Sequence, residues 1–322
     1  MSKKLQLPGF RAINRGYNSV FHPGRLSLGL VLPLERYDAG PVPTMEHHLA
    51  RARLADTLGF SALWLRDVPF NVPLFGDAGQ LFDPFVYLGF LAAHTEQIAL
   101  GAASVVLPLR HPAHVAKAAA SADVLSGGRV ILGVASGDRP QEYPALGVPF
   151  GQRGDLFRES FSYIQRMGEK VPAFENVFGS PAGDIDMLPK PASGRLPLLI
   201  TGGSQQDPAW LASNGDGWML YPRTPSAQAG IIDDWRGRIQ ANGGPGRPVM
   251  QPLYVDLLED PEAPAQPIHL GLRTGVASLR SHLQRLELVG VNHVALNLRF
   301  NRADMQSTLL CLADELLPEF ST

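Results

Sequence analysis

The sequence feature that most constrains the fold is a joint that occurs four times along the chain: a helix end, a glycine and then an apolar strand. The four copies read TLGFSALWL, LSGGRVILG, SNGDGWMLY and LVGVNHVAL. A glycine just after a helix ends it in a left-handed turn, and a strand that is apolar on both faces is covered by helices on both sides. Repetition of this joint predicts a parallel sheet whose strands are connected by helices.

One stretch, residues 97–138, contains a complete unit of this pattern. Its first strand is a near-continuous apolar run, and Pro112 then suits the first turn of a helix. Gly127 and Gly128 end that helix, and the next apolar strand follows at once. That strand runs into a small polar segment, as expected where a parallel strand delivers its C-terminal end.

Reading the whole chain in this way gives eight strand–helix units. The expected strands are residues 26–34, 62–65, 98–106, 130–134, 196–201, 218–220, 249–255 and 293–296. Eight units favour a closed barrel over an open doubly wound sheet, which usually has fewer strands. We therefore predict an α/β protein with one (β/α)8 TIM-barrel domain over residues 26–322. Residues 1–25 are expected to form an N-terminal arm, and residues near 169–196 an irregular insertion.

Composition excludes several classes of partner. The net charge of −2 leaves no surplus of basic residues for a nucleic-acid backbone. No run of about 18 apolar residues occurs that could cross a membrane, and the lysines near the N-terminus are not followed by a long apolar segment. Cys311 is the single cysteine, so no intrachain disulfide can form. These observations predict a cytoplasmic protein without a nucleic-acid or membrane partner.

Polar residues follow the expected strands and would form a ring at the mouth of the barrel, where such folds keep their chemistry. They are Arg66, Asp67, Ser104, His111, Ser136, Gly137, Asp138, Thr201, Gly202, Gly203, Ser204, Tyr221, Arg223, Asp256, Asn297 and Arg299. The ring contains no acidic pair or histidine cluster that would identify a reaction. His47 and His48 are adjacent on a helix and point to different faces, so no metal site is expected.

The most specific local motif is ITGGSQQDPAW, which places two glycines and a serine between a strand and a helix. Such a turn exposes consecutive backbone N–H groups and, with the helix N-terminus, attracts a phosphate. The alternative is a tight turn that needs glycine only for its dihedral angles. Local sequence does not decide between the two.

Two aromatic features of the strand ends suggest packing or solvent exclusion. The loop 68–83 carries three phenylalanines among turn-forming residues, which suggests a pocket wall or lid. Trp64, on the second strand, is expected to fill the core rather than stack on a ligand.

The stretch LGAASVVLPLRHPAHVAKAAASADVLSGGRVILGVASGD resembles the bacterial luciferase-like flavin monooxygenase family, and the chain is closest to its luciferase-type oxidoreductase subgroup. The resemblance extends from about Leu26 to Leu317 and includes EYPALGVPF, Arg153 and TGGSQQ. It implies a barrel with FMN at the mouth and a non-proline cis peptide bond between Ala103 and Ser104. It also implies that Gly202, Gly203 and Ser204 hold the flavin phosphate together with the strand-four loop. The implied cofactor-binding residues are thus Ala103, Ser104, Ser136, Gly137, Tyr143, Thr201, Gly202, Gly203 and Ser204.

One departure from the family concerns catalysis. Luciferases carry a catalytic histidine just after the second strand, where this chain has Arg66 and Asp67. Catalytic residues therefore stay unassigned, with Arg66, Asp67 and Asp138 as pocket candidates. Asp67 either orients a polar substrate or bonds to Arg66 at the barrel rim.

The resemblance leads to three functional hypotheses. The first is a two-component monooxygenase that uses reduced FMN, supplied by a separate flavin reductase, and oxygen on a small organic substrate. The second is a deazaflavin-dependent oxidoreductase that transfers hydride, and the third is a flavin-binding protein without activity. Relatives on this barrel often pair, so a homodimer is expected.

Overall fold

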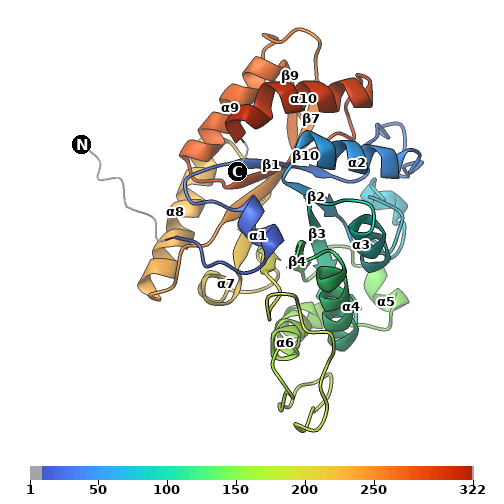
Figure 1. Cartoon of the computed structure of the whole chain (residues 1–322), viewed down its shortest axis with the longest axis vertical. Helices are drawn as coiled ribbons and strands as arrows, with labels where there is room; N and C mark the ends of the chain where they lie inside the picture. Colours follow the sequence, from blue (N-terminus) through green and yellow to red (C-terminus); the bar gives the residue numbers. More distant parts are fainter. Residues whose placement is uncertain (1–8, 321–322) are drawn as a thin grey trace.

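Eight parallel strands close into a barrel in the computed structural model, which describes residues 9–320 (Figure 1). In chain order the barrel strands are β1 (Ser27–Val31), β2 (Ala62–Leu65), β3 (Ala99–Val106), β4 (Val130–Ala135), β5 (Leu198–Thr201), β6 (Gly217–Met219), β7 (Val249–Leu257) and β10 (His293–Asn297). Each strand pairs with the next, and β10 pairs with both β7 and β1, which closes the barrel. The predicted (β/α)8 fold is confirmed.

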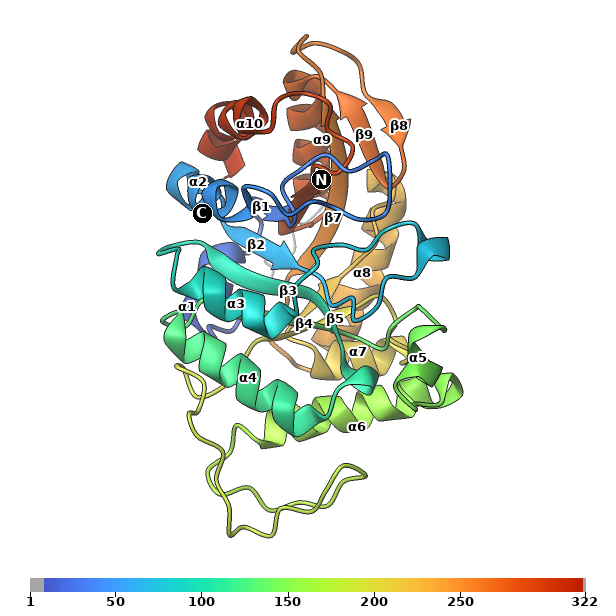
Figure 2. The same cartoon turned by 90° about the vertical axis from the view of Figure 1, so that its right-hand side faces the viewer.

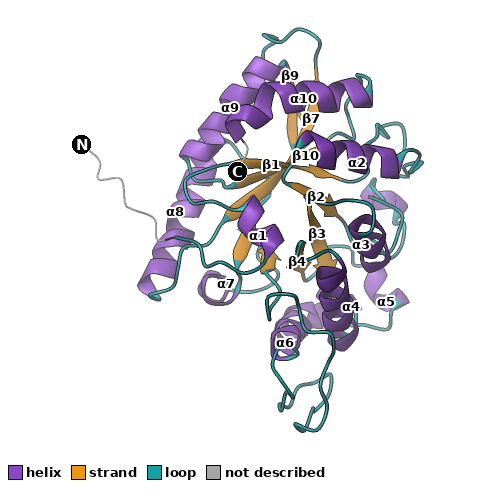
Figure 3. Cartoon of the chain, in the orientation of Figure 1, coloured by secondary structure: helices purple, strands orange, loops and turns teal. Residues whose placement is uncertain are grey.

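Helices surround the strands (Figure 3). They are α1 (Arg15–Val20), α2 (His48–Leu58), α3 (Pro84–Ala92), α4 (Pro112–Leu125), α5 (Glu142–Ala145), α6 (Arg153–Arg166), α7 (Pro208–Asn214), α8 (Pro225–Ala241), α9 (Val276–Leu288) and α10 (Met305–Phe320), with 3-10 turns at Pro73–Phe75, Leu107–Leu109 and Phe150–Gln152. Four of the helices, α3, α4, α7 and α8, begin at a proline that follows a side chain accepting a hydrogen bond from the first turn. The N–H of a first helical residue has no partner within the helix, so proline, which has no N–H, is well suited to that position. A capping side chain followed by proline therefore starts a helix at a defined residue.

Side chains fill the inside of the barrel. Trp64 is fully buried there, in one cluster with residues of other barrel strands such as Ala99, Ile131 and Met250. A Cβ on Gly101 would lie 2.2 Å from the Trp64 ring, so only glycine leaves room for the indole at that point of β3. The expectation that Trp64 belongs to the core is confirmed.

The N-terminal end of the barrel is closed by the described part of the predicted arm; residues 1–8 lie outside the described range. Val20 and Phe21, at the end of α1, pack with the residues inside the barrel. The Trp64 indole N–H donates to Nε2 of His293 at 2.8 Å, so the imidazole proton lies on Nδ1. Nδ1 is 2.7 Å from the hydroxyl of Ser27, which itself donates to the Val20 carbonyl at 2.7 Å. This chain of hydrogen bonds fastens α1 to the barrel.

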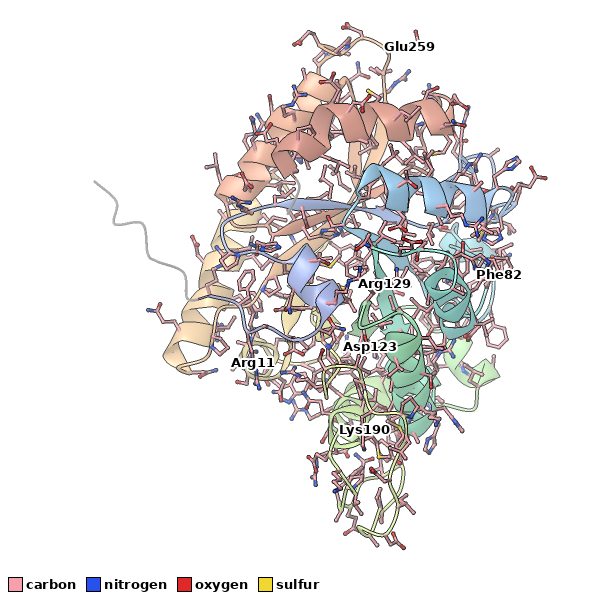
Figure 4. All side chains as sticks on the ribbon, viewed as in Figure 1. Arg11, Phe82, Asp123, Arg129, Lys190 and Glu259 are labelled. Atoms are coloured by element: carbon pink, nitrogen blue, oxygen red, sulfur yellow. The ribbon has the colours of Figure 1, made fainter. Side chains whose placement is uncertain are left out.

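A buried arginine organises the LSGGR turn between α4 and β4. Arg129 is 2% exposed and donates to four backbone carbonyls and to the Thr95 hydroxyl, joining the end of α3 to the starts of β3 and β4. Asp123 accepts from Asn14 and from the N–H of Val130, and burial raises the pKa of its carboxyl. Both residues face the α1 side of the molecule in Figure 4. The motif thus serves the packing of the barrel.

Two segments depart from the regular alternation. Between α6 and β5 the chain makes an irregular excursion that extends away from the barrel beyond α4 and α6 (Figure 2). A hairpin of β8 (Gln266–Ile268) and β9 (Gly271–Thr274), absent from the sequence-based prediction, adds to the end of β7. In Figure 2 this hairpin and α5 lie on the side opposite α1, which is the side of the C-terminal strand ends. Among residues 9–320, no helix has the length and apolar character needed to span a membrane.

Candidate functional site

The C-terminal ends of β3 and β5 bring two of the predicted cofactor residues together. The hydroxyls of Ser104 and Thr201 form a short hydrogen bond, and Thr201 also lies 3.1 Å from the Met219 sulfur. The Ala103–Ser104 peptide bond is cis, and β3 carries one extra residue against β4 between Ala102 and Val105. The expected cis bond at this position is confirmed.

The turn after β5 has the geometry of an anion cradle. Gly202, Ser204 and Gln205 all have positive φ, and Gly203 between them is exposed with open space where a Cβ would stand. Gly202 donates its N–H to the Met219 carbonyl, whereas the N–H groups of Gly203, Ser204 and Gln205 donate to no other described group. Three neighbouring free N–H groups fit the oxygens of a phosphate.

The start of α6 lies against this turn. A Cβ on Gly154 would be 2.9 Å from that of Gln205, so the two segments are in contact. The Arg153 guanidinium stacks over the Phe150 ring at 3.8 Å, and its buried Nε has no partner within residues 9–320. The Arg153 cation and the N-terminus of α6 therefore lie beside the free N–H groups, and both favour an anion. One negative charge is also close, because the Asp207 carboxylate caps α7.

The segment after β4 holds the remaining predicted cofactor residues. The Tyr143 hydroxyl donates to the Ser136 carbonyl in a short hydrogen bond, and a Cβ on Gly137 would lie 2.8 Å from that hydroxyl. Tyr143 is fully buried, so its ring shapes the segment and Gly137 is required for the close approach. Asp138 is exposed, and its charge adds to burial in raising the pKa of Tyr221.

A buried ionic cluster sits over the ends of β2 and β10. Asp77 accepts two hydrogen bonds from Arg66, at 2.8 and 3.0 Å, and lies 3.1 Å from Nη1 of Arg299. It also accepts from the Tyr37 hydroxyl and the Gly79 N–H. Burial opposes ionisation of Asp77, but Arg66 outweighs it and lowers the pKa of the carboxyl to about 2. The cluster fixes loop 68–83 against the barrel.

The structure corrects one alternative for Asp67. Its carboxylate accepts two hydrogen bonds from Arg110, at 2.8 and 2.7 Å, and one from the Val106 N–H. Arg66 is instead paired with Asp77, so the expected Asp67–Arg66 contact at the rim does not form. The reason is that Arg110, which follows β3 in the sequence, places its guanidinium at the end of β2, beside Asp67. Asp67 thereby anchors the turn that follows β3.

A second pair holds loop 68–83 from the side of β4. The Arg139 guanidinium stacks over Phe75 at 4.1 Å and donates to the Asp77 carbonyl. The Glu142 carboxylate lies 3.8 Å from Nη1 of Arg139. Glu142 is 2% exposed, and burial raises the pKa of its carboxyl to about 7. Phe82 points away from this site toward His48 and Tyr87, so it does not belong to the cover of the mouth (Figure 4).

The rest of the predicted ring has mixed roles. His111 caps α4, with its side chain accepting the N–H of Ala113. Asp256 lies 3.4 Å from Arg273 of the β8–β9 hairpin, and Asn297 accepts the N–H of Arg299. Arg223 is exposed. Within residues 9–320, no three His, Cys, Asp or Glu side chains are grouped to hold a metal ion.

Residues 20–288 match the model of the family described as luciferase-like monooxygenase. The chain belongs to the luciferase-like monooxygenase family. The chain is therefore an enzyme of the luciferase-like monooxygenase kind, and the resemblance inferred from the sequence is confirmed.

Curated relatives agree with this assignment. An uncharacterized protein of Mycobacterium tuberculosis is 33% identical over 190 residues, 54% of this chain and 67% of that protein. The 4-hydroxyprotoasukamycin monooxygenase of Streptomyces nodosus subsp. asukaensis is 27% identical over 233 residues, 70% of this chain and 61% of its own. The oxygenase component of the flavin-dependent trigonelline monooxygenase of Acinetobacter baylyi is 31% identical over 134 residues, 41% of this chain and 34% of its own. The matches thus span less than two thirds of both named monooxygenases.

Solved structures share the barrel. The monooxygenase RslO1 from Streptomyces bottropensis superposes with a TM-score of 0.77 at 19% identity, and an F420-dependent secondary alcohol dehydrogenase with 0.76 at 17%. The oxygenating constituent of 3,6-diketocamphane monooxygenase from Pseudomonas putida, solved with FMN, gives 0.72 at 13% identity. The alignments cover 92% of this chain and 99–100% of those chains. At these identities the likeness shows the fold.

Several residues of the candidate site in this luciferase-like monooxygenase, Asp77 and Glu142 among them, were not singled out from the sequence. Asp77 is the charged centre of the cluster, yet in the sequence it is one acidic residue in an apolar loop. The signal that could have identified it is that two arginines, Arg66 and Arg299, follow strands β2 and β10, which neighbour β1 on either side in the closed barrel. Two cations at the ends of the strands that flank β1 leave buried positive charge, which a carboxylate between them compensates.

Proposed function

We propose that this protein is the oxygenase component of a two-component monooxygenase, using reduced FMN and oxygen on a small organic substrate. The observation that carries the proposal is the turn after β5, where three free N–H groups lie beside Arg153 and the start of α6. FMN ends in a phosphate that such a turn can hold, and the alcohol and thioether groups of Ser104, Thr201 and Met219 lie at the neighbouring strand ends. The relatives named as monooxygenases support the same reaction class.

In this proposal the flavin supplies the redox chemistry, and the protein supplies binding and the exclusion of water. The turn holds the phosphate, and the cis-linked residues of β3 form the wall behind the ring. Loop 68–83, fixed by Asp77 and Arg139, covers the mouth with Phe75. No NAD(P)H fingerprint follows a strand in the sequence, so a separate flavin reductase would supply the reduced cofactor.

The phosphate assignment can be tested at Gly203. Gly203→Asp is expected to weaken binding of reduced FMN by about tenfold or more, because a carboxylate would face the phosphate. Riboflavin, which lacks the phosphate, should bind the variant and the wild type equally well. Anaerobic fluorescence titrations measure both affinities. Gly203→Ala is the matched control, since open space surrounds that position. Equal effects on FMN and riboflavin, or no effect on either, would contradict the assignment.

The deazaflavin alternative is favoured by the F420-dependent dehydrogenase among the structural neighbours. Titration of the same protein with FMN and with F420, followed by oxygen-uptake measurements on the reduced complex, separates the hypotheses. A monooxygenase binds FMN and consumes oxygen when a reductase and a substrate are present. Preference for F420 supports hydride transfer, and FMN that binds without accelerated reoxidation supports a flavin-binding protein without activity.

We also propose a homodimer that forms through the outer face of α3. The helix is apolar around its whole circumference, yet Val86 is 72% exposed and Phe90 is partly exposed. A helix that is apolar on all sides is normally covered on all sides. Val86→Glu is expected to convert the dimer to a monomer in light-scattering measurements. Leu125→Glu, at an equally exposed leucine on α4, is the control and should leave the dimer intact. A monomeric wild type would refute this proposal.

A further inference from the structure

Two cavities lie at the N-terminal ends of β5, β6 and β7, at the opposite end of the barrel from the candidate flavin site. The first, of about 270 Å³, lies between α4, α6 and the excursion before β5. The second, of about 230 Å³, lies between the N-terminal segment, the end of α7 and the start of β7. Gln165 and Arg195 line both cavities, so the two are neighbours. Figure 4 labels Arg11, from the wall of the second cavity, and Lys190, on the excursion.

The second cavity is electropositive. Three arginines, Arg11, Arg195 and Arg247, line it together with one carboxylate, Asp216. Asp216 is already engaged by Arg195 and by the N–H of Leu198. Arg247 donates to two carbonyls at the end of α7, which leaves its positive charge without a carboxylate partner. Within residues 9–320, the Arg11 side chain has no hydrogen bond or ion pair. Three cations and one anion attract a negatively charged group.

The first cavity is mainly apolar. Its walls include Ala116, Ile164, Met187, Leu196 and Leu198. The one carboxylate on its rim, Glu169, is paired with Arg166 at 2.7 Å and so adds no free negative charge. Apolar walls of this kind favour a hydrocarbon segment over water.

We propose that the two cavities form one binding site for a small amphiphilic anion, with a carboxylate among Arg11, Arg195 and Arg247 and an apolar tail against Ile164 and Leu196. Gln165, at the junction, can donate its amide N–H to the same carboxylate. Because this site lies at the far end of the barrel, it is separate from the flavin and substrate site. It does not depend on the reaction proposed above.

The experiment measures binding of octanoate to the full chain by isothermal titration calorimetry. Octanoate is expected to bind at one site per chain and at least about tenfold more tightly than acetate, which lacks the tail, or octanol, which lacks the charge. Arg11→Gln should weaken octanoate binding by about fivefold. Ala116→Leu, which fills the apolar cavity, should weaken it by about tenfold.

The control is Arg25→Gln, which removes an exposed arginine next to β1 that lines neither cavity. It should bind octanoate like the wild type. Wild-type affinity in both Arg11→Gln and Ala116→Leu would place the ligand elsewhere and overturn the proposal, as would the absence of saturable octanoate binding. Acetate binding as tightly as octanoate would overturn the role of the apolar cavity. If Ala116→Leu fails to fold, the comparison of Arg11→Gln with Arg25→Gln still decides.

Discussion

Asp77→Asn is expected to lower the free energy of unfolding at pH 7 by about 3–5 kcal/mol, because it leaves the buried Arg299 and the partly buried Arg66 without a carboxylate. Arg66 and Arg299 both point at this one side chain, whose carboxyl is about one-tenth exposed. An amide keeps the shape and can still accept from Tyr37, but it carries no charge. Urea unfolding monitored by circular dichroism measures the effect.

The same substitution is expected to release loop 68–83. Asp77 holds the loop through Arg66 and Arg299, and the loop in turn receives Arg139 at the Asp77 carbonyl. Hydrogen–deuterium exchange should therefore rise in this loop in the variant, while the barrel strands keep their protection. Asp38→Asn is the matched control, since Asp38 pairs with Arg36 at 2.7 Å on the surface and should change stability by no more than about 1 kcal/mol. Equal losses in the two variants would show that burial of the cluster is unimportant.

The barrel could be predicted because its signals are local. Glycine follows the helix at each of the four joints, in a left-handed turn at three of them and in extended backbone at Gly215. A proline after a capping side chain marks the starts of four helices. The β8–β9 hairpin was missed because it is short, its β8 residues are largely exposed, and it has no apolar alternation to distinguish it from a loop. α1 was missed for a similar reason: one turn and a half of helix gains its stability from packing under the barrel, which no local pattern reveals.

The site was only partly predictable, because its contacts join distant positions. The turn after β5 could be recognised from its own residues, and the cis bond between Ala103 and Ser104 was implied by the family resemblance. The pairing of Arg66 with Asp77 and of Asp67 with Arg110 could not be predicted, since each carboxylate had several arginines available and only the closed barrel decides which one is near. The role of Tyr143 at the phosphate stays a prediction, and its hydroxyl donates to the Ser136 carbonyl within the segment after β4.

His293, at the N-terminal end of the barrel, leads to a prediction of how the free energy of unfolding depends on pH. Burial lowers the pKa of His293 to about 3, compared with 6.5 for an unperturbed histidine. Between these values the unfolded chain binds a proton that the folded chain does not, so the free energy of unfolding falls as the pH decreases. The slope from this one residue is about 1.4 kcal/mol per pH unit, which amounts to about 2–3 kcal/mol between pH 6.5 and 4.5.

The structure explains why His293 resists a proton. Its Nε2 already accepts the indole N–H of Trp64, so a proton there would face a donor, and its Nδ1 proton is used by Ser27. His293→Gln cannot titrate, and its amide can accept and donate in the same two directions. We expect this variant to be less stable than the wild type at pH 7 but to lose about 2–3 kcal/mol less between pH 6.5 and 4.5. Urea unfolding of both proteins across this range measures the difference. The other titrating groups are the same in both proteins, so their contributions cancel in it. Parallel pH profiles would show that the imidazole accepts a proton in the folded barrel and that the hydrogen-bonded chain to α1 does not hold it neutral.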